Sequence, residues 1–245
     1  MINILVISDN VELVSHMQTL HKKLKGIDFK IDYRFSVVNK NPDGLLSLGM
    51  TCVDVKDTEA VASIVNNYDL VISAHCKQIF PKELVENVRC INIHPGLNPY
   101  NRGWYPQVFS IINKMPIGCT IHEMNEHVDH GAIIYQRRVD VYSDDTSLEV
   151  YNRVQNAEKE LLNEYFKSLV LGSYKATKMK GDGNYNGIED FNKLCELDLN
   201  HYGTLSEHLD ILRALSHGEF SNAYFTNCSG DKVYLKLDFI HRRMK

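Results

Sequence analysis

The sequence predicts an α/β fold with a mostly parallel, twisted sheet and a small C-terminal appendage made of a helix and a β-hairpin. Short apolar runs alternate with amphipathic segments along the first part of the chain, a pattern typical of buried parallel strands covered by helices on both faces. The 245 residues suit one large domain, or one domain of about 150–200 residues with an appendage. Apolar residues make up 44% of the chain and charged residues 24%, so neither a disordered chain nor a coiled coil is indicated.

The first part of the chain alternates between predicted strands and predicted helices. Continuous apolar runs or apolar–polar alternation predict strands at 2–8, 29–37, 50–55, 70–74 and 90–93. Near-helical spacing of apolar residues predicts helices at 11–24 and 58–67, and a proline in the first turn supports a helix at 81–87. Ligands collect at the carboxyl ends of the strands in such sheets, so the loops after 8, 74 and 94 are the places to expect a site.

The second part of the chain contains a helix at 104–113, strands at 117–123 and 132–141, and a long amphipathic helix at 147–171. Glycine and polar residues at 180–184 indicate a boundary, so we expect a main domain at 1–180 and an appendage at 181–245. The appendage contains a helix near 206–215 and a hairpin, 223–227 and 232–240, that turns at Ser229-Gly230-Asp231. Because about 60 residues are too few for a robust core of their own, we expect this appendage to pack on the main domain or on a second subunit.

Composition disfavours several functional classes. The 27 Lys and Arg against 31 Asp and Glu give a net charge of −4, which disfavours a nucleic-acid partner. The apolar runs fall short of the ~20 residues of a membrane helix, and the N-terminal run lacks a basic region, so we expect no membrane association and no secretory signal. Six cysteines without a C-x-x-C pair predict reduced thiols in a cytoplasmic protein and no bound metal. The loop after the first strand lacks G-x-G-x-x-G, which disfavours a dinucleotide cofactor.

Three polar residues have the chemistry of acyl transfer to an amine. Asn92 and His94 are two apart in a predicted strand, so their side chains project from the same face. A neutral His94 can accept the proton of an amine, Asp129 can orient the imidazole and stabilise its charged form, and Asn92 can donate to a developing oxyanion. No Ser or Cys nucleophile is needed when the amine attacks directly.

Over about its first 170 residues, the chain resembles the formyltransferases that use 10-formyltetrahydrofolate. The resemblance rests on three motifs in the family's order, namely Asn92-x-His94-Pro95-Gly96, Gly118-x-Thr120-x-His122 and Asp129-x-Gly131-x-Ile133-Ile134-x-Gln136. It implies a Rossmann-like formyltransferase catalytic domain at 1–180, in which Asn92, His94 and Asp129 occupy the positions of the family's catalytic trio.

Further segments narrow the branch of the family. Residues 73–81 and 98–107 are similar to the small dTDP-sugar N-formyltransferases, and 211–216 with 221–225 resemble a segment beyond the catalytic domain of amino-sugar nucleotide formyltransferases. The chain lacks the large basic C-terminal barrel of the tRNA enzyme and the glycine-rich phosphate loop of the purine enzyme. The resemblance therefore implies formyl transfer to a dTDP-linked amino-dideoxy sugar, with 4-amino-4,6-dideoxyglucose favoured, for a surface polysaccharide such as O-antigen.

The resemblance also implies a homodimer, with the appendage serving dimerisation and nucleotide contact, and a folate site formed by two loops, 74–81 and 125–129. The residues expected to contact 10-formyltetrahydrofolate are His75, Cys76, Gln78, Ile79, Phe80, Asn125 and His127.

A nucleotide sugar has a pyrophosphate and a base, and each needs a partner. Lys77 and Arg102 lie in the loops expected to flank the strand ends and suit the pyrophosphate, although each is also compatible with an ordinary exposed cation. Trp104 with Tyr105, or residues of the appendage hairpin, suit the base, although a core role is also open for them. The predicted substrate contacts are Lys77, Asn98, Tyr100, Arg102, Trp104, Tyr105, Asn222 and Tyr224.

Three alternatives remain open from the sequence. The same fold and trio suit a dTDP-3-amino or a UDP-amino sugar as the acceptor. Water in place of the amine gives a formyltetrahydrofolate hydrolase, and a chain without turnover is a non-catalytic binding subunit. The intact trio disfavours the binding subunit, because a binder needs no base.

Overall fold

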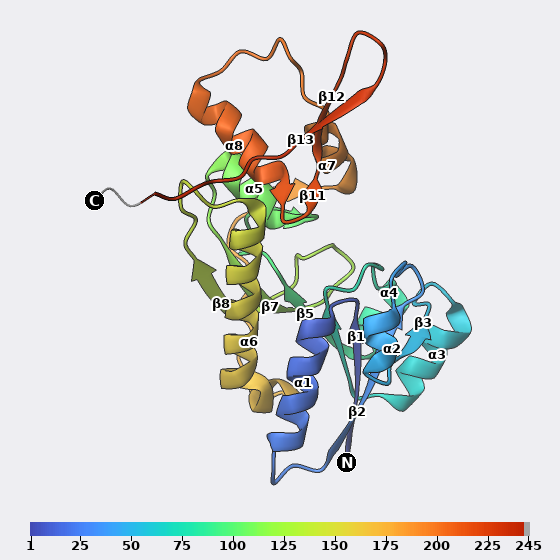
Figure 1. Cartoon of the computed structure of the whole chain (residues 1–245). Coiled ribbons are helices and arrows are strands. Elements are labelled where there is room, and N and C mark those ends of the chain that lie inside the picture. Colours follow the sequence, from blue (N-terminus) through green and yellow to red (C-terminus); the bar gives the residue numbers. More distant parts are fainter. Residues whose placement is uncertain (243–245) are drawn as a thin grey trace.

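A seven-stranded sheet forms the centre of the computed structural model, which describes residues 1–242 (Figure 1). Its strand order is β3-β2-β1-β4-β5-β7-β8. The strands are β1 (Ile2–Ser8), β2 (Phe29–Ser36), β3 (Thr51–Val53), β4 (Leu70–Ala74), β5 (Arg89–His94), β7 (Ile117–Glu123) and β8 (Ile133–Val139). The strands β1 to β5 pair in parallel, whereas β7 runs antiparallel to both of its neighbours. The predicted mostly parallel α/β sheet is thus confirmed.

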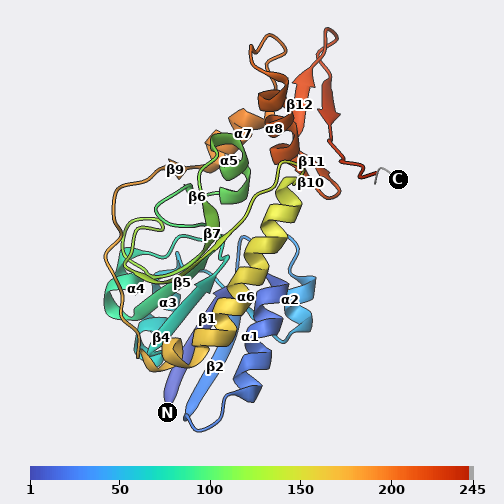
Figure 2. The same ribbon diagram turned by 90° about the vertical axis from the view of Figure 1, so that its left-hand side faces the viewer.

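Helices cover both faces of the sheet. The helices of the described residues are α1 (Val11–Lys23), α2 (Asp43–Ser47), α3 (Thr58–Asn67), α4 (Lys82–Asn87), α5 (Pro106–Asn113), α6 (Ser147–Leu171), α7 (Ile188–Cys195) and α8 (Leu205–Leu215). Helices α1 and α6 pack side by side on one face, and α3 and α4 lie on the other (Figures 1 and 2).

Strand β1 shows why this segment is apolar on both faces. Ile4 and Val6 belong to the core under α1 and α6, whereas Leu5 and Ile7 belong to the core under α3 and α4, and all four are fully buried. Burying each such side chain stabilises the fold by about 1.5–3 kcal/mol. A continuous apolar run is therefore the expected sequence for a central parallel strand.

Side-chain caps fix the starts of the two helices that matter most for the site. Asn10 precedes α1, and its Oδ1 accepts a hydrogen bond from the Leu13 amide at 3.0 Å. Thr146 precedes α6 and forms a capping box with Glu149. Both helices therefore begin at defined residues beside the carboxyl ends of the strands.

The C-terminal elements lie at the end of the molecule opposite the N terminus (Figure 1). Beside α7 and α8 they comprise β9 (Tyr185–Asn186), which pairs with β6 (Arg102–Gly103), the pair β10 (Ser216–His217) and β11 (Phe220–Ser221), and the hairpin β12 (Ala223–Thr226) and β13 (Lys232–Leu235). Helix α8 packs on α5, and Phe191, Ala214, Leu215 and Ala223 join the core of the main sheet. The appendage thus packs on the main domain, as expected, although the boundary at 180 remains a prediction. Residues 243–245 of the predicted appendage lie outside the described residues.

Several elements differ from the predictions. Helices α2 and α7 and the short pair β6–β9 were not expected from the pattern, and β13 ends at Leu235 rather than at 240. Helix α5 begins at Pro106 rather than at 104, because Tyr105 adopts a left-handed backbone conformation with φ of 49°. No helix within residues 1–242 combines the length and the apolar character that a membrane span requires.

Candidate active site

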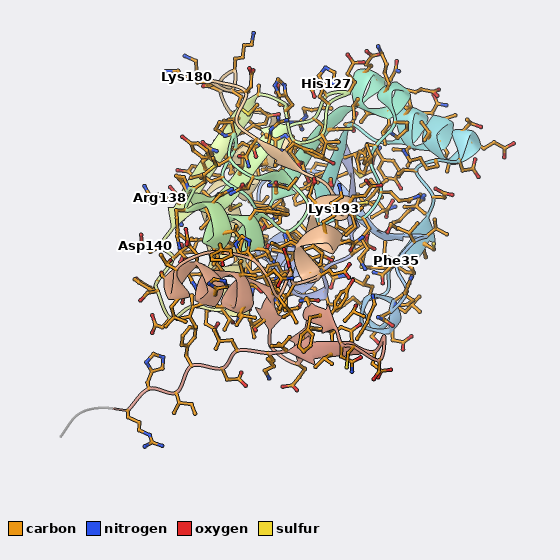
Figure 3. All side chains as sticks on the ribbon, turned by 90° about the horizontal axis from the view of Figure 1, so that it is seen from above. Phe35, His127, Arg138, Asp140, Lys180 and Lys193 are labelled. Carbon is orange, nitrogen blue, oxygen red and sulfur yellow. The ribbon has the colours of Figure 1, made fainter. Side chains whose placement is uncertain are left out.

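A cavity of about 590 Å³ opens beyond the carboxyl ends of β4 and β5. Its walls come from the loops after these strands, from the 124–129 loop, from the start of α6 and from the C-terminal elements. Figure 3 looks down on this end of the molecule and labels His127 of the 124–129 loop and Lys193 of α7. A volume of this size is typical of small-molecule sites.

Asn92, His94 and Asp129 meet in the wall of this cavity. The Asn92 Nδ2 donates to Asp129 Oδ1 at 3.0 Å, and His94 Nδ1 lies 3.5 Å from Asp129 Oδ2. The first two residues belong to β5, as the two-residue spacing predicted, and the third comes from the loop between β7 and β8. An amide donor, an imidazole and a carboxylate therefore lie within contact distance of one another at one point of the cavity wall.

The backbone around Asp129 aims its carboxylate at the other two residues. Asp129 has a left-handed φ of 50°. The Asn98 side-chain amide donates to the Asp129 carbonyl at 2.8 Å, and the Gly103 amide donates to Asp129 Oδ2 at 3.1 Å. Since a non-glycine residue rarely adopts this conformation, these hydrogen bonds hold a strained position.

Burial controls the protonation of His94. Its side chain is 4% exposed, and burial lowers the pKa of His94 to about 4, although the Asp129 charge opposes this shift. His94 is therefore a neutral imidazole at pH 7, the form that accepts a proton. Burial by itself raises the pKa of Asp129, but the positive charges that His94 and His122 carry when they are protonated, together with the Gly103 amide, hold the pKa of Asp129 well below its usual range.

His122 adds a second imidazole beside the trio. Its Nδ1 lies 2.7 Å from the Glu123 carbonyl oxygen, which can only accept, so Nδ1 carries a hydrogen. Its Nε2 lies 3.4 Å from Asn92 Nδ2 and 3.5 Å from Asp129 Oδ1. His122 thus helps to fix the orientation of the Asn92 amide.

Gly96 provides the space that His94 occupies. A Cβ at Gly96 would lie 2.3 Å from His94 Nε2, closer than any real contact. That nitrogen has no hydrogen-bond partner among residues 1–242. A side chain at position 96 would therefore displace the His94 imidazole, and glycine leaves room for its unpaired Nε2.

All the residues predicted to contact the folate line the cavity. They are His75, Cys76, Gln78, Ile79, Phe80, Asn125 and His127. With Met124 and Val128, the apolar members of this set form a wall suited to a flat heterocycle. Their individual contacts with a ligand remain predictions.

The residues predicted to contact the sugar nucleotide divide into two groups. Lys77, Trp104, Tyr105 and Asn222 line the cavity, whereas Asn98, Tyr100, Arg102 and Tyr224 do not.

Contacts elsewhere explain three of these four differences from the prediction. Asn98 is buried and binds the Asp129 carbonyl. The Arg102 guanidinium donates to the carbonyls of Val128 and Asp182, so it clamps two loops. Tyr224 lies in the hairpin, where the Lys232 ammonium contacts its ring. The fourth, Tyr100, is partly exposed outside the cavity.

Several cavity residues escaped the sequence analysis. Ser147 and Tyr151 come from α6, and Tyr185 comes from β9. Phe191 comes from α7, His217 from β10 and Phe220 from β11. Only tertiary packing brings these residues to the strand ends. For α7, a signal was present, because Phe191, Leu194 and Cys195 follow Gly187 at helical spacing.

Comparison with known proteins identifies the family. The formyl transferase model matches residues 8–166, and the model of the N-formyltransferase dimerization C-terminal domain matches residues 190–241. The chain belongs to the formyl transferase family. Asn92, His94 and Asp129 of this formyltransferase lie in one cavity at the strand ends, where open α/β sheets bind ligands.

Full-length relatives of this formyltransferase act on sugars, according to their names. It is 45% identical to the dTDP-4-amino-4,6-dideoxyglucose formyltransferase of Mycobacterium bovis over 234 residues, 96% of this chain and 95% of the relative. The solved structure of a sugar N-formyltransferase from a Shewanella species has a TM-score of 0.96 and 55% identity, covering 99% of this chain and 100% of the other. The solved structure of a 4-N formyltransferase from Francisella tularensis has a TM-score of 0.91 and 40% sequence identity, covering 98% of this chain and 98% of the other.

Proposed function

We propose that this formyltransferase transfers the formyl group of 10-formyltetrahydrofolate to the amine of a dTDP-linked 4-amino-4,6-dideoxy sugar. The observation that carries the proposal is the meeting of Asn92, His94 and Asp129 in the wall of one cavity. The choice of acceptor is supported by the 45% identity to an enzyme named for that sugar along nearly the whole chain.

We assign the proton transfer to His94. Addition of a neutral amine to the formyl carbon puts a positive charge on the amine nitrogen and a negative charge on the formyl oxygen. His94, neutral because it is buried, accepts the proton from that nitrogen and returns it to the leaving nitrogen of the folate. Asp129 stabilises the imidazolium while it exists, from 3.5 Å away.

Asn92 stabilises the negative charge on the formyl oxygen. One of its amide hydrogens is held by Asp129 at 3.0 Å, and the other makes a longer contact of 3.4 Å with His122. We infer that the ligand oxygen takes the place of the longer contact. One donor of this kind is worth about 10²–10³ in rate.

The two ligands fit different walls of the cavity. The apolar wall with Ile79 and Phe80 suits the pterin of the folate co-substrate. The aromatic wall with Trp104 and Tyr105 suits the base, and the exposed Lys77 suits the pyrophosphate. Among residues 1–242, no cluster of three or more potential ligands that could hold a metal ion occurs.

The test incubates the protein with 10-formyltetrahydrofolate and a panel of dTDP-3-amino, dTDP-4-amino and UDP-amino sugars. We expect a formamido sugar from the dTDP-4-amino member, detected by mass spectrometry, and turnover reduced about 100-fold or more by His94→Gln. Formylation of a different panel member would correct the acceptor. Free formate without formylated sugar would instead indicate the hydrolase.

We also propose a cytoplasmic homodimer with a catalytic domain at 1–180, serving synthesis of a surface polysaccharide such as O-antigen. The match of residues 190–241 to a dimerization domain supports the dimer. Apolar side chains in the same region are exposed, such as Tyr202 at 97%, and a dimer contact would bury them. The six free cysteines suit a reducing compartment. Sedimentation at micromolar concentration tests the dimer.

A further inference from the structure

A second histidine–carboxylate pair lies beside the active-site cavity, whose wall includes the histidine of the pair, His75. His75 Nε2 is 2.8 Å from Glu158 Oε1, and the Glu158 side chain is fully buried. Glu158 Oε2 has no hydrogen-bond partner among residues 1–242. His75 follows β4 with a left-handed φ of 55°, so the backbone holds this imidazole in a conformation that costs free energy. None of these groups has a part in the chemistry assigned to the trio.

The neighbours of His75 define which of its nitrogens carries the hydrogen. The carboxylate of Glu158 accepts, so Nε2 is the donor. Asn10 Oδ1 is engaged by the Leu13 amide at the start of α1, so its Nδ2 is the atom that faces His75 Nδ1 at 3.3 Å. An Nδ2 group only donates, so His75 Nδ1 offers a lone pair. Nδ1 is therefore the acceptor nitrogen of this imidazole, and its lone pair can take up a proton.

Tyr151 connects this imidazole to the cavity. Its hydroxyl lies 3.4 Å from His75 Nδ1 and accepts a hydrogen bond from Asn10 Nδ2 at 3.2 Å. The hydroxyl hydrogen points to His75 Nδ1, whose one lone pair it shares with the Asn10 amide, and one lone pair of the hydroxyl oxygen remains for a ligand. Burial, followed by the charge of Glu158, raises the pKa of Tyr151 to about 12, so the hydroxyl keeps its proton at pH 7.

Formyl transfer to a sugar amine needs a second proton acceptor, and this step rests on the function proposed above. The amine reaches the enzyme largely as an ammonium ion, and it must lose one proton before its nitrogen can attack. The proton that His94 accepts later is a different one, which it returns to the folate nitrogen. The overall reaction therefore releases one proton that the trio does not accept.

We propose that Glu158, His75 and Tyr151 form the proton acceptor that converts the bound ammonium into the attacking amine. An ammonium N–H bond breaks and its proton passes to the Tyr151 oxygen, while the Tyr151 hydroxyl proton moves to His75 Nδ1. The electron pair stays on the amine nitrogen. The resulting imidazolium keeps its Nε2–H on the Glu158 carboxylate, and the proton leaves to water after the products.

Charges in the cavity favour the transfer of a proton from the ammonium ion to His75. The buried carboxylate of Glu158 gives the Glu158–His75–Tyr151 group a net negative charge, which attracts an ammonium ion and stabilises the imidazolium. The titratable groups that face His75 are Glu158 and Tyr151 of α6 and, across the cavity, His94 of β5.

The test measures kcat/KM for the amino sugar from pH 6.5 to 9.5 with Glu158→Gln and with Tyr151→Phe. We expect a loss on the order of 100-fold at pH 7 for each variant. The loss should shrink to a few-fold at the highest pH, where the sugar amine is already neutral in solution. The KM for 10-formyltetrahydrofolate should stay within about two-fold of the wild-type value, because neither Glu158 nor Tyr151 belongs to the apolar wall that suits the folate.

Two matched variants serve as controls, each with the same chemical change on the same side of the molecule. Glu160→Gln alters an exposed carboxylate two residues along α6, and Tyr135→Phe removes a hydroxyl bonded to Ser168 outside the cavity. Both should keep the wild-type pH profile. A defect of equal size at every pH, or a wild-type profile in both test variants, would overturn the proposal while leaving the sugar-formylating activity standing. A wild-type enzyme that formylates no amino sugar would overturn the proposed function first, and this proposal with it.

Discussion

Burial of His94 makes the stability of the fold depend on pH. The folded-state pKa of about 4 lies below the ordinary histidine value of 6.5, so between these values the unfolded chain binds a proton that the folded chain does not. Stability therefore falls as the pH falls from 6.5 to 4, by about 3 kcal/mol from this residue. Below about pH 4 the depressed pKa of Asp129 adds a further loss, since the unfolded chain then protonates this carboxylate while the folded chain does not.

We therefore predict that His94→Gln flattens the pH dependence of unfolding. Urea titrations at pH 7, 5.5 and 4.5 should show a shallower decline in the free energy of unfolding for this variant than for wild type. The less buried His21, whose pKa burial also lowers but which lies outside the cavity, supplies the comparison variant His21→Gln, which should flatten the decline less than His94→Gln does. Parallel declines for wild type and His94→Gln would show that His94 is not buried in its neutral form.

Gly96→Ala tests the space beside His94. The added methyl group would lie 2.3 Å from His94 Nε2, so the imidazole must move away from its position. We expect kcat to fall about 100-fold, because a displacement of about 1 Å in a catalytic group costs that much. The circular dichroism spectrum should not change. Gly187→Ala, where the nearest atom would be 3.5 Å away, should retain wild-type kcat, and a fully active Gly96→Ala variant would contradict the steric role.

The sequence motifs predicted the trio because its residues lie at strand ends, where their direction follows from local geometry. Asn92 and His94 share a face by their two-residue spacing, and the loop after β7 brings Asp129 to them. Arg102 shows the limit of such reasoning, because its guanidinium binds backbone carbonyls rather than the cavity. Polarity in a loop indicates a polar partner without saying whether that partner is a ligand or the chain itself.

At the scale of elements, periodicity predicted the long and the buried segments well. The bounds of α3, β4, β7 and α6 agree with the expected ranges, since these elements contain strong apolar patterns. Helix α2 has five residues, and β6 and β9 have two each. Segments this short contain too few residues to show a helical or strand periodicity of apolar side chains. The β6–β9 pair also joins segments about 80 residues apart, and only the folded chain creates it.

Arg213 joins α8 to the segment before α6, and its removal should destabilise the protein. The buried guanidinium donates to the carbonyls of Tyr142 and Asp145 and to the Asp210 carboxylate. Arg213→Ala removes the donor to the two carbonyls, while Lys114 still pairs with the Asp210 carboxylate, so we expect a loss of about 2–4 kcal/mol in the free energy of unfolding. Urea titration measures it. Arg138→Ala, which changes an exposed arginine of β8 (Figure 3), should cost less than about 0.5 kcal/mol. Similar losses in the two variants would contradict this role.

At the scale of the whole molecule, the C-terminal elements and the sheet share both a core and a cavity. Phe191 and Leu215 pack with the core under α5 and α6. Tyr185, His217 and Asn222 line the cavity that contains the trio at the strand ends. A sequence boundary at 180 therefore divides residues that the fold uses together, although composition changes there.

We predict that a chain ending at residue 180 neither folds cooperatively nor transfers formyl groups. Loss of Phe191 and Leu215 from the core alone costs about 3–6 kcal/mol, a large part of the roughly 5–15 kcal/mol by which domains are stable. Thermal unfolding followed by circular dichroism should show no sharp transition, and the folate assay should show no product. A chain ending at residue 240 keeps Phe191 and Leu215 and should unfold and react like the full chain. Cooperative unfolding of the shorter chain would show that residues 1–180 have a sufficient core of their own, and the C-terminal elements would then serve only the site and the dimer.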